Sequence, residues 1–378
     1  MSKHGEDLPS PCYLLDESRL RTNLQLIAEV KRAGNCQIIL ALKGFAMWSA
    51  FPLVRQFLSG CATSSLYETR LAKKWFGGHV HLYAPAYDPG DFSTLIELAD
   101  RITFNSLEQW LRFGEPATAA GISCGLRVNP GVDEVATPLY NPCGPQSRLG
   151  ISPTGLGANL PPGIEGLHVH ALCESNADST ERLIEAVEDK FGHLLGQLKW
   201  LNLGGGHLMT RDGYDLGRLI RALRTITDRY RELELVLEPG AAIAWQTGSL
   251  ITTVLDVIER GGTHIAILDT SATAHMPDIL EMPYRPEVEG AGNPGEKPYT
   301  YQLGGSTCLA GDVIGDYSFT QRLTVGKRLV FKDMIHYTMV KSTMFNGIVH
   351  PAIAIQRENG NVQVVRKFGY TDYESRLS

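Results

Sequence analysis

The sequence predicts a (β/α)₈ barrel of the TIM type followed by an antiparallel β-domain. Short apolar, β-rich runs alternate with amphipathic stretches through the first part of the chain, and after about residue 243 short strands and turns replace them. A length of 378 residues suits one barrel and a second, smaller domain. We therefore expect an N-terminal strand in residues 1–16 that joins the β-domain, a barrel in 17–243, and the β-domain itself in 244–378.

The barrel elements are expected in the order strand, helix, strand, as parallel strands require. A first helix over residues 17–33 precedes them, and Asp16 or Ser18 is expected to cap it. The expected strands are 37–43, 60–64, 80–83, 101–104, 124–128, 164–170, 199–203 and 234–238. The expected helices include 46–58, 66–75, 94–99, 107–112, 179–195 and 215–231.

One connection in the barrel is unusually long. Residues 130–163 are rich in Gly, Pro and Asn, with little helical pattern, and they contain Ser147-Arg148-Leu149-Gly150. Long connections of this kind in a compact domain usually carry function.

The β-domain is expected to contain strands at residues 249–259, 264–269, 300–303, 328–331, 349–356 and 362–366, and the run 12–16 is expected to join them.

Composition excludes several classes of function. The net charge of −6 gives no basic surplus for nucleic acid or anionic lipid. The polar N-terminus lacks a signal-peptide core, and no apolar run could cross a bilayer. Seven cysteines without a Cys-x-x-Cys pattern indicate reduced thiols in a cytoplasmic protein. No metal site is expected, and His79 and His81 are interpreted as structural.

Polar residues gather where the barrel strands are expected to end. Active sites of such barrels lie at the C-terminal ends of the strands. Lys43, His170 and Glu238 end the first, sixth and eighth expected strands. Ser65, Glu68, Arg127 and Gly204-Gly205-Gly206 lie at or near the ends of three others.

These residue types together favour one kind of chemistry. A lysine in a partly dry barrel mouth has a lowered pKa, which frees its amine to attack an aldehyde. The glycine run, which we expect to precede a helix, would let backbone N–H groups face a phosphate. Glu238 could keep a pyridine nitrogen protonated, which carbanion chemistry needs. The sequence thus predicts pyridoxal 5′-phosphate held as a Schiff base on Lys43.

Other barrel residues are expected to support this site. His170 could stack on a planar cofactor, whereas His168, one layer deeper, is interpreted as a core histidine. Arg127 is expected to pair with Glu68 across the mouth.

The β-domain offers a Gly-rich loop and an acidic loop. The first carries Cys308 and Asp312, and a phenol follows at Tyr337. The second holds Asp278 and Glu281, which could bind a cationic substrate.

The chain resembles the pyridoxal-phosphate-dependent decarboxylases of the alanine-racemase fold, a group that includes ornithine, diaminopimelate and carboxynorspermidine (carboxyspermidine) decarboxylases. The resemblance runs from Pro11 to Tyr370. It rests on Ala41-Leu42-Lys43, the His170 strand, the glycine run, Glu238-Pro239-Gly240, the Cys308 loop and Tyr337. The segments 41–45, 167–174, 206–207, 274–286 and 308–312 look most like carboxynorspermidine decarboxylases.

The resemblance implies decarboxylation of carboxynorspermidine or carboxyspermidine to norspermidine or spermidine by a homodimer. It implies that His170 stacks on the cofactor and that Cys308, from the neighbouring subunit, protonates the Cα carbanion. The implied cofactor contacts are Lys43, His170, Gly204, Gly205, Gly206, Glu238, Gly240, Tyr337, Arg127 and Ser65. The implied substrate contacts are Asp278, Glu281, Asp312, Arg148 and Glu174.

Two positions depart from the wider group. Ala241 replaces an arginine that ornithine-type enzymes use on the phosphate, and Leu309 replaces the acid that follows the loop cysteine. Asp312, or Asp278 and Glu281, would then have to bind the distal amine. The alternatives are a diaminopimelate or ornithine decarboxylase, an alanine racemase, a non-catalytic PLP-binding homeostasis protein, and a barrel without cofactor.

Overall fold

The structure is a computed structural model that describes residues 7–132, 134–135 and 140–378. The chain divides into two compact units. Residues Arg21–Ile243 form one unit, called the barrel unit here. Residues up to Leu20 together with Ala244–Ser378 form the other, called the sheet unit.

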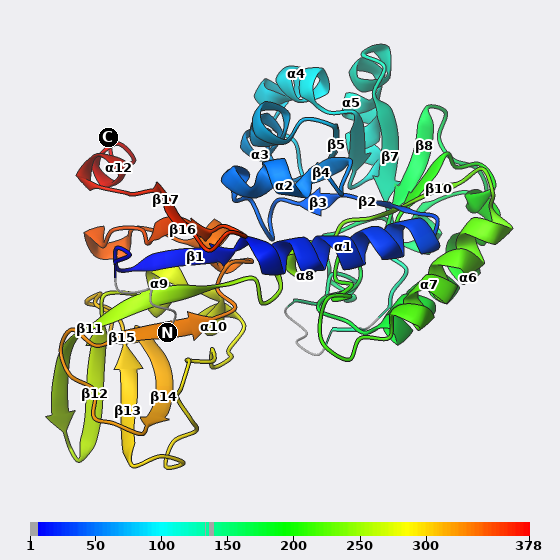
Figure 1. Ribbon diagram of the computed structural model, residues 1–378. Coiled ribbons are helices and arrows are strands. Elements are labelled where there is room, and N and C mark those ends of the chain that lie inside the picture. Colours follow the sequence, from blue (N-terminus) through cyan, green and yellow to red (C-terminus); the bar gives the residue numbers. More distant parts are fainter. Residues whose placement is uncertain (1–6, 133, 136–139) are drawn as a thin grey trace. The chain divides into compact units, whose positions relative to one another are not determined.

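The barrel unit contains a parallel sheet that nearly closes on itself (Figure 1). The order is β2-β10-β9-β8-β7-β6-β5-β4-β3, and every neighbouring pair in it is parallel. The strands are β2 (Gln37–Ile38), β3 (Leu40–Ala41), β4 (Gly60–Thr63), β5 (His79–Tyr83), β6 (Arg101–Phe104), β7 (Ser123–Arg127), β8 (Ile164–His168), β9 (Trp200–Asn202) and β10 (Glu234–Leu237).

The first expected strand is split, and this split closes the barrel. Its first half, β2, pairs with β10, and its second half, β3, pairs with β4. Between and after them, Ile39 N donates to Leu237 O and Leu42 N donates to Ala62 O. One chain segment therefore bridges the first and last neighbours of the sheet, so the fold is the predicted barrel.

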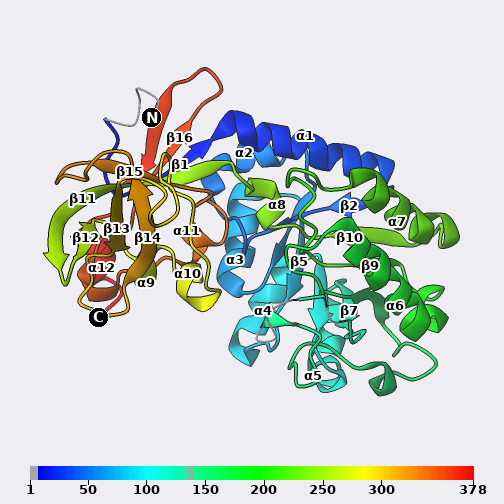
Figure 2. The ribbon, with the colours of Figure 1, turned by 90° about the horizontal axis from the view of Figure 1, so that it is seen from below.

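Helices surround these strands (Figures 1 and 2). The carboxylate of Asp16 accepts from the N–H groups of Ser18 and Arg19, so Asp16 caps the first helix. The helices are α1 (Glu17–Ala33), α2 (Phe51–Val54), α3 (Leu66–Leu71), α4 (Pro89–Leu98), α5 (Leu107–Ala119), α6 (Ala177–Leu195), α7 (Leu216–Arg229) and α8 (Ala241–Ala244). Figure 2 shows α6 and α7 side by side.

Several expected helix bounds were wrong. The expected helix 46–58 is reduced to a 3₁₀ turn, Trp48–Ala50, and the four residues of α2, which starts beside Pro52. Residues Ala72–Phe76 continue α3 as a π-helix. Helix α4 starts earlier than expected because Asp88 caps it. Helix α5 runs to Ala119 in spite of an internal proline.

A tryptophan fills the barrel interior because two glycines make room for it. Trp200 on β9 is fully buried, and its indole N–H donates to Ser123 Oγ at 2.9 Å. A Cβ built on Gly125 or Gly166, on neighbouring strands, would lie 2.2 or 2.1 Å from the Trp200 ring. These glycines therefore fix the packing of the core below the strand ends.

The sheet unit holds one eight-stranded sheet of mixed direction. The path is β14-β13-β12-β11-β1-β16-β17, and β15 pairs with β11. The pairs β1·β16 and β12·β13 are parallel, so the expected wholly antiparallel sheet is corrected in this respect. The strands are β1 (Cys12–Asp16), β11 (Gly248–Arg260), β12 (Thr263–Leu268), β13 (Tyr299–Gly304), β14 (Val313–Phe319), β15 (Arg328–Lys332), β16 (Ala352–Gln356) and β17 (Val362–Arg366).

Strand β14 was missed by the sequence analysis, and β1 pairs with β11 and β16. Among its described residues this unit also has four short α-helices: α9 (Ala272–His275), α10 (Asp278–Glu281), α11 (Thr338–Lys341) and α12 (Tyr370–Glu374). Among the residues described, no helix has the length and apolarity to cross a membrane.

Candidate active site

A small cavity opens at the C-terminal ends of the barrel strands. It brings together four residues that the sequence analysis placed there: Lys43, Arg127, His170 and Glu238. The remaining lining residues are Ala41, Ala62, Thr63, Ser64, His81, Tyr83 and His168. The residues come from six of the strands or the segments just after them.

Lys43 and His170 face each other in this cavity. Both lie two residues beyond the ends of their strands, β3 and β8, rather than at the expected strand ends. Their Nζ and Nε2 atoms are 3.4 Å apart. Lys43 opens to solvent at the mouth, but the protein atoms around it lower its pKa by desolvation, an effect that Glu238 opposes. Burial, the largest cause, holds the pKa of His170 well below its ordinary value.

The Glu238 carboxylate contacts one amide and one imidazole. Asn202 Nδ2 donates to Oε1 at 2.5 Å, and His168 Nε2 lies 3.4 Å from Oε2. Burial alone would raise the pKa of Glu238, but His168, and His81 after it, lower it to about 2. Glu238 is therefore ionised at neutral pH. His168, interpreted from sequence as a core residue, is buried but also contacts this carboxylate.

Asn202 was missed by the sequence analysis, and it links two parts of the site. Besides its bond to Glu238, its Oδ1 accepts from Gly204 N at 2.8 Å. The side chain is buried in β9. The signal was present in the sequence, since Asn202 is the polar residue in the apolar run Leu201-Asn202-Leu203 before the glycines.

The glycine run forms a tight turn after β9. Gly204 and Gly206 have φ values of +70° and +92°, which favour glycine. A Cβ on Gly204 would lie 2.5 Å from His170 Nδ1, and one on Gly205 would lie 2.5 Å from Glu238 O. The helix expected directly after the run was wrong, because α7 begins only at Leu216.

Two of the three glycine N–H groups have acceptors within the protein. Gly204 N donates to Asn202, and Gly205 N donates to His170 Nδ1 at 2.9 Å. The expectation that the whole run points its N–H groups at an anion is therefore not met. The run instead ties the strand ends together, because its backbone packs closely against His170 and Glu238.

Gly240 also serves close packing. A Cβ built on Gly44 would lie 2.7 Å from the Cα of Gly240. The two backbone segments that follow Lys43 and Glu238 therefore touch, which brings these two side chains into one cavity.

Arg127 contacts His170 and Tyr83 and not Glu68, the partner expected from the sequence. Its Nη2 donates to His170 O at 3.1 Å, and its guanidinium lies 4.6 Å from the centroid of the Tyr83 ring. The expected Arg127–Glu68 ion pair is wrong for the described residues, because the Glu68 carboxylate accepts from Ser64 N instead. Ser65 caps α3 by accepting from Glu68 N at 3.2 Å.

The long connection reaches this region through Asn105. The Asn105 amide donates to Arg148 O and accepts from Gly150 N and Tyr83 Oη–H, each at 2.8 Å. Arg148 itself is exposed. Glu174 is exposed as well and has a φ of +46°.

The other predicted site residues belong to the sheet unit. Cys308 is an exposed free thiol in the loop after β13, and its backbone N donates to Asn346 Oδ1 at 2.9 Å. Tyr337 directly precedes α11 and has a φ of +53°.

The carboxylate of Asp312 accepts hydrogen bonds from residues of the sheet unit. One carboxylate oxygen accepts from Ser271 Oγ and Thr273 N, and the other accepts from Thr307 N and Oγ1. The side chain is buried, and four donors occupy both oxygens. Both oxygens are thus occupied within the sheet unit, and the binding of a substrate amine by Asp312 stays a prediction.

Asp278 and Glu281 share a cation. Both carboxylates bind the ammonium of Lys341, with Glu281 Oε2 at 2.6 Å from Nζ. The pair can thus hold a primary ammonium, and a substrate amine would have to share or replace Lys341.

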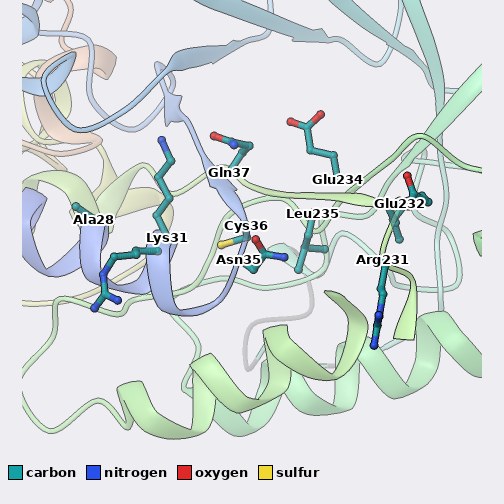
Figure 3. A pocket seen from close by; sticks show the side chains of 11 residues that line it. Ala28, Lys31, Asn35, Cys36, Gln37, Arg231, Glu232, Glu234 and Leu235 are labelled. Carbon is teal, nitrogen blue, oxygen red and sulfur yellow. The ribbon is translucent and has the colours of Figure 1, made fainter. Parts of the chain in front are cut away.

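A wider hollow lies at the other end of the barrel strands (Figure 3). It is lined by the end of α1 and by residues just before and at the start of β2 and β10, and it contains none of the predicted site residues. The described residues also contain no group of three or more His, Cys, Asp or Glu side chains suited to a metal.

The residues of the barrel cavity fit pyridoxal phosphate. A lysine with a lowered pKa can attack an aldehyde, and an ionised carboxylate can hold a proton on a ring nitrogen. The glycine turn lies directly beside this pair, since Gly205 N donates to His170 Nδ1. This fold and site define a pyridoxal-phosphate protein of the alanine-racemase fold.

Comparison with known proteins identifies the family within this class. Residues 12–335 match the family described as pyridoxal-dependent decarboxylase, C-terminal sheet domain. The chain belongs to this family and is an enzyme, a carbon–carbon lyase.

Two relatives and one solved structure match nearly the whole chain. It is 51% identical to a carboxyaminopropylagmatine decarboxylase of Synechocystis sp., over 98% of this chain and 96% of the relative. It is 42% identical to a carboxynorspermidine/carboxyspermidine decarboxylase of Campylobacter jejuni, over 98% and 99%. The crystal structure of carboxynorspermidine decarboxylase from Campylobacter jejuni, complexed with norspermidine, matches with a TM-score of 0.90 at 40% identity, over 98% of this chain and 100% of that chain.

Proposed function

We propose that this enzyme decarboxylates a carboxylated polyamine, carboxynorspermidine or carboxyspermidine, with pyridoxal phosphate bound at Lys43. The observation that carries the proposal is the facing pair Lys43 and His170 beside an ionised Glu238 in one cavity. The relatives named above support the substrate class.

Each residue of the cavity has its own role in the proposed reaction. When bound, the cofactor supplies an electron sink for the bond between Cα and the carboxylate. Lys43 provides the amine that holds it, and Glu238 keeps the ring nitrogen protonated. Asn202 and His168 fix the Glu238 carboxylate, and Arg127 holds the backbone of His170 in place.

We further propose that the active enzyme is a homodimer. In that dimer Cys308 of a neighbouring subunit would protonate the Cα carbanion, and Tyr337 would contact the phosphate. The exposed, free thiol of Cys308 supports this role, since a proton donor must reach the reacting carbon. Cys308→Ala should retain the cofactor but slow turnover or divert it toward transamination.

A second substrate deserves a direct test because of one relative. The Synechocystis protein at 51% identity is named for carboxyaminopropylagmatine, whose agmatine part ends in a guanidinium group instead of a primary amine. Diaminopimelate and ornithine are less well supported, because the relatives that match at 37–51% identity over the full chain carry polyamine-type names.

Steady-state CO₂ release from four compounds tests the proposal. These are carboxynorspermidine, carboxyspermidine, carboxyaminopropylagmatine and diaminopimelate. We expect the highest kcat/KM on one of the two carboxylated triamines. A preference for carboxyaminopropylagmatine would move the assignment to the guanidinium substrate, and a preference for diaminopimelate would overturn it.

A further inference from the structure

A backbone N–H, an imidazole and an amine form a chain across the barrel mouth. Gly205 N lies 2.9 Å from Nδ1 of His170, and Nε2 of the same ring lies 3.4 Å from Nζ of Lys43. The backbone of the ring is held as well, since Arg127 donates to its carbonyl. Both ring nitrogens therefore have fixed neighbours.

The first contact decides where the imidazole proton is. A backbone N–H can only donate, so Nδ1 of His170 must accept and carries no hydrogen. The neutral ring then has its proton on Nε2, which faces Lys43. An ammonium at Lys43 would place N–H groups against this N–H, whereas a neutral amine offers it a lone pair.

The groups around Lys43 act in opposite directions on its protonation state. Burial, the largest influence, disfavours the ammonium, and so does Arg127, whereas Glu238 and Glu68 favour it. The hydrogen bond from His170 is a directional contribution that favours only the neutral amine.

We propose that Gly205 fixes the tautomer of His170, and that His170 in turn holds Lys43 as the unprotonated amine before the cofactor arrives. His170 is thus a positioning residue for Lys43 in the cofactor-free protein. This inference rests on the proposed function, because it explains how Lys43 is ready to take up an aldehyde.

The tautomer can be measured in the unaltered cofactor-free protein. ¹⁵N-detected NMR of His170 should show an unprotonated Nδ1 and a protonated Nε2 at neutral pH. A protonated Nδ1, or a ring protonated on both nitrogens, would overturn the proposal without any variant having to fold.

Competitive labelling of amines tests the effect on Lys43. The cofactor-free protein is treated with limiting acetic anhydride across a pH series, and mass spectrometry follows Lys43, with the exposed Lys327 as internal reference. His170→Phe keeps a ring but cannot donate, so the labelling of Lys43 at pH 7.5 should fall about ten-fold for each unit by which its pKa rises. His170→Gln keeps an N–H donor and should restore most of the labelling.

Equal labelling of Lys43 in the wild type and in His170→Phe would contradict the proposal. This result is separate from a failure of the proposed function, because the label needs no cofactor. A protein that shows the predicted labelling but no visible absorbance with pyridoxal phosphate would keep the inference about Lys43 and remove the cofactor assignment.

Discussion

The Nε2 atom of His168 lies 3.4 Å from Oε2 of Glu238, inside the barrel and one strand layer below His170. With its proton on Nε2, a neutral His168 can donate to the carboxylate without adding a second charge to the cavity. Together with Asn202 it keeps Glu238 ionised in a buried place where a carboxyl group would otherwise take up a proton. The electron-sink chemistry proposed for this site depends on that ionised state.

Replacing Glu238 by Gln should leave the cofactor bound but lower kcat at least about 100-fold, because the negative charge that would stabilise a protonated ring nitrogen is lost. Steady-state kinetics and the visible spectrum measure the two effects. Glu234→Gln is the matched control, since Glu234 begins β10, the strand that Glu238 follows, but pairs with Arg101. Similar kcat values for Glu238→Gln and the control would count against the role of Glu238.

Asn202→Leu should weaken cofactor binding about 10- to 100-fold, because it removes a hydrogen bond to a charged group and the acceptor for Gly204 N. The pKa of Glu238 should also rise, since Asn202 helps to lower it. Equilibrium titration with pyridoxal phosphate, followed by absorbance, measures the affinity. An unchanged dissociation constant would show that Asn202 does not organise the site.

Acid should destabilise the barrel unit through His207. The ring is buried, its Nδ1 lies 3.0 Å from Thr180 Oγ1, and burial lowers its pKa to about 4. Between pH 6.5 and 4 the unfolded chain binds a proton at this position that the folded chain does not, so stability falls as the pH falls. The loss from His207 alone between pH 7 and 5 is about 2 kcal/mol.

Denaturant unfolding at both pH values measures this loss, and His207→Gln provides the comparison. The variant should show a smaller difference between pH 7 and pH 5 than the wild type, by about the same 2 kcal/mol. An equal pH dependence of the two proteins would rule out His207 as a source of the acid sensitivity.

Asp312→Ala should lower the stability of the sheet unit by about 3 kcal/mol, because four donors lose their acceptor in a buried place. Asp316→Ala is the control, since Asp316 is exposed on β14, and its effect should stay within about 0.5 kcal/mol. Unfolding midpoints compare the variants. A stable Asp312→Ala with a raised KM for substrate would instead support the substrate-binding role.

Much of the barrel was predictable from the sequence because its strands are short apolar runs between amphipathic helices. Lys43, His170 and Glu238 could be placed in one site because the carboxyl ends of parallel strands meet at one face of a barrel. Residues such as Asn202 were missed because a polar side chain inside a strand shows its role only when its partners are known. The pairing of Arg127 with Tyr83 and His170, rather than Glu68, depends on side-chain directions that spacing does not give.

The sheet unit was harder to predict for a physical reason. The strands of the parallel pair β1·β16 lie far apart in the sequence, and those of β12·β13 are separated by a long connection. Local sequence patterns carry no information on such pairing. The hydrogen bonds of Asp312 could not be predicted for a similar reason, since its donors Ser271 and Thr273 lie about 40 residues away in the sequence.

The attachment of the cofactor tests the central claim most directly. The protein is incubated with pyridoxal phosphate, reduced with borohydride, digested and analysed by mass spectrometry, beside Lys43→Ala treated in the same way. We predict a single major phosphopyridoxyl adduct on the peptide that contains Lys43, and loss of both this adduct and the visible absorbance in the variant. An adduct chiefly on another lysine, or an absorbance band that survives in Lys43→Ala, would contradict the assignment.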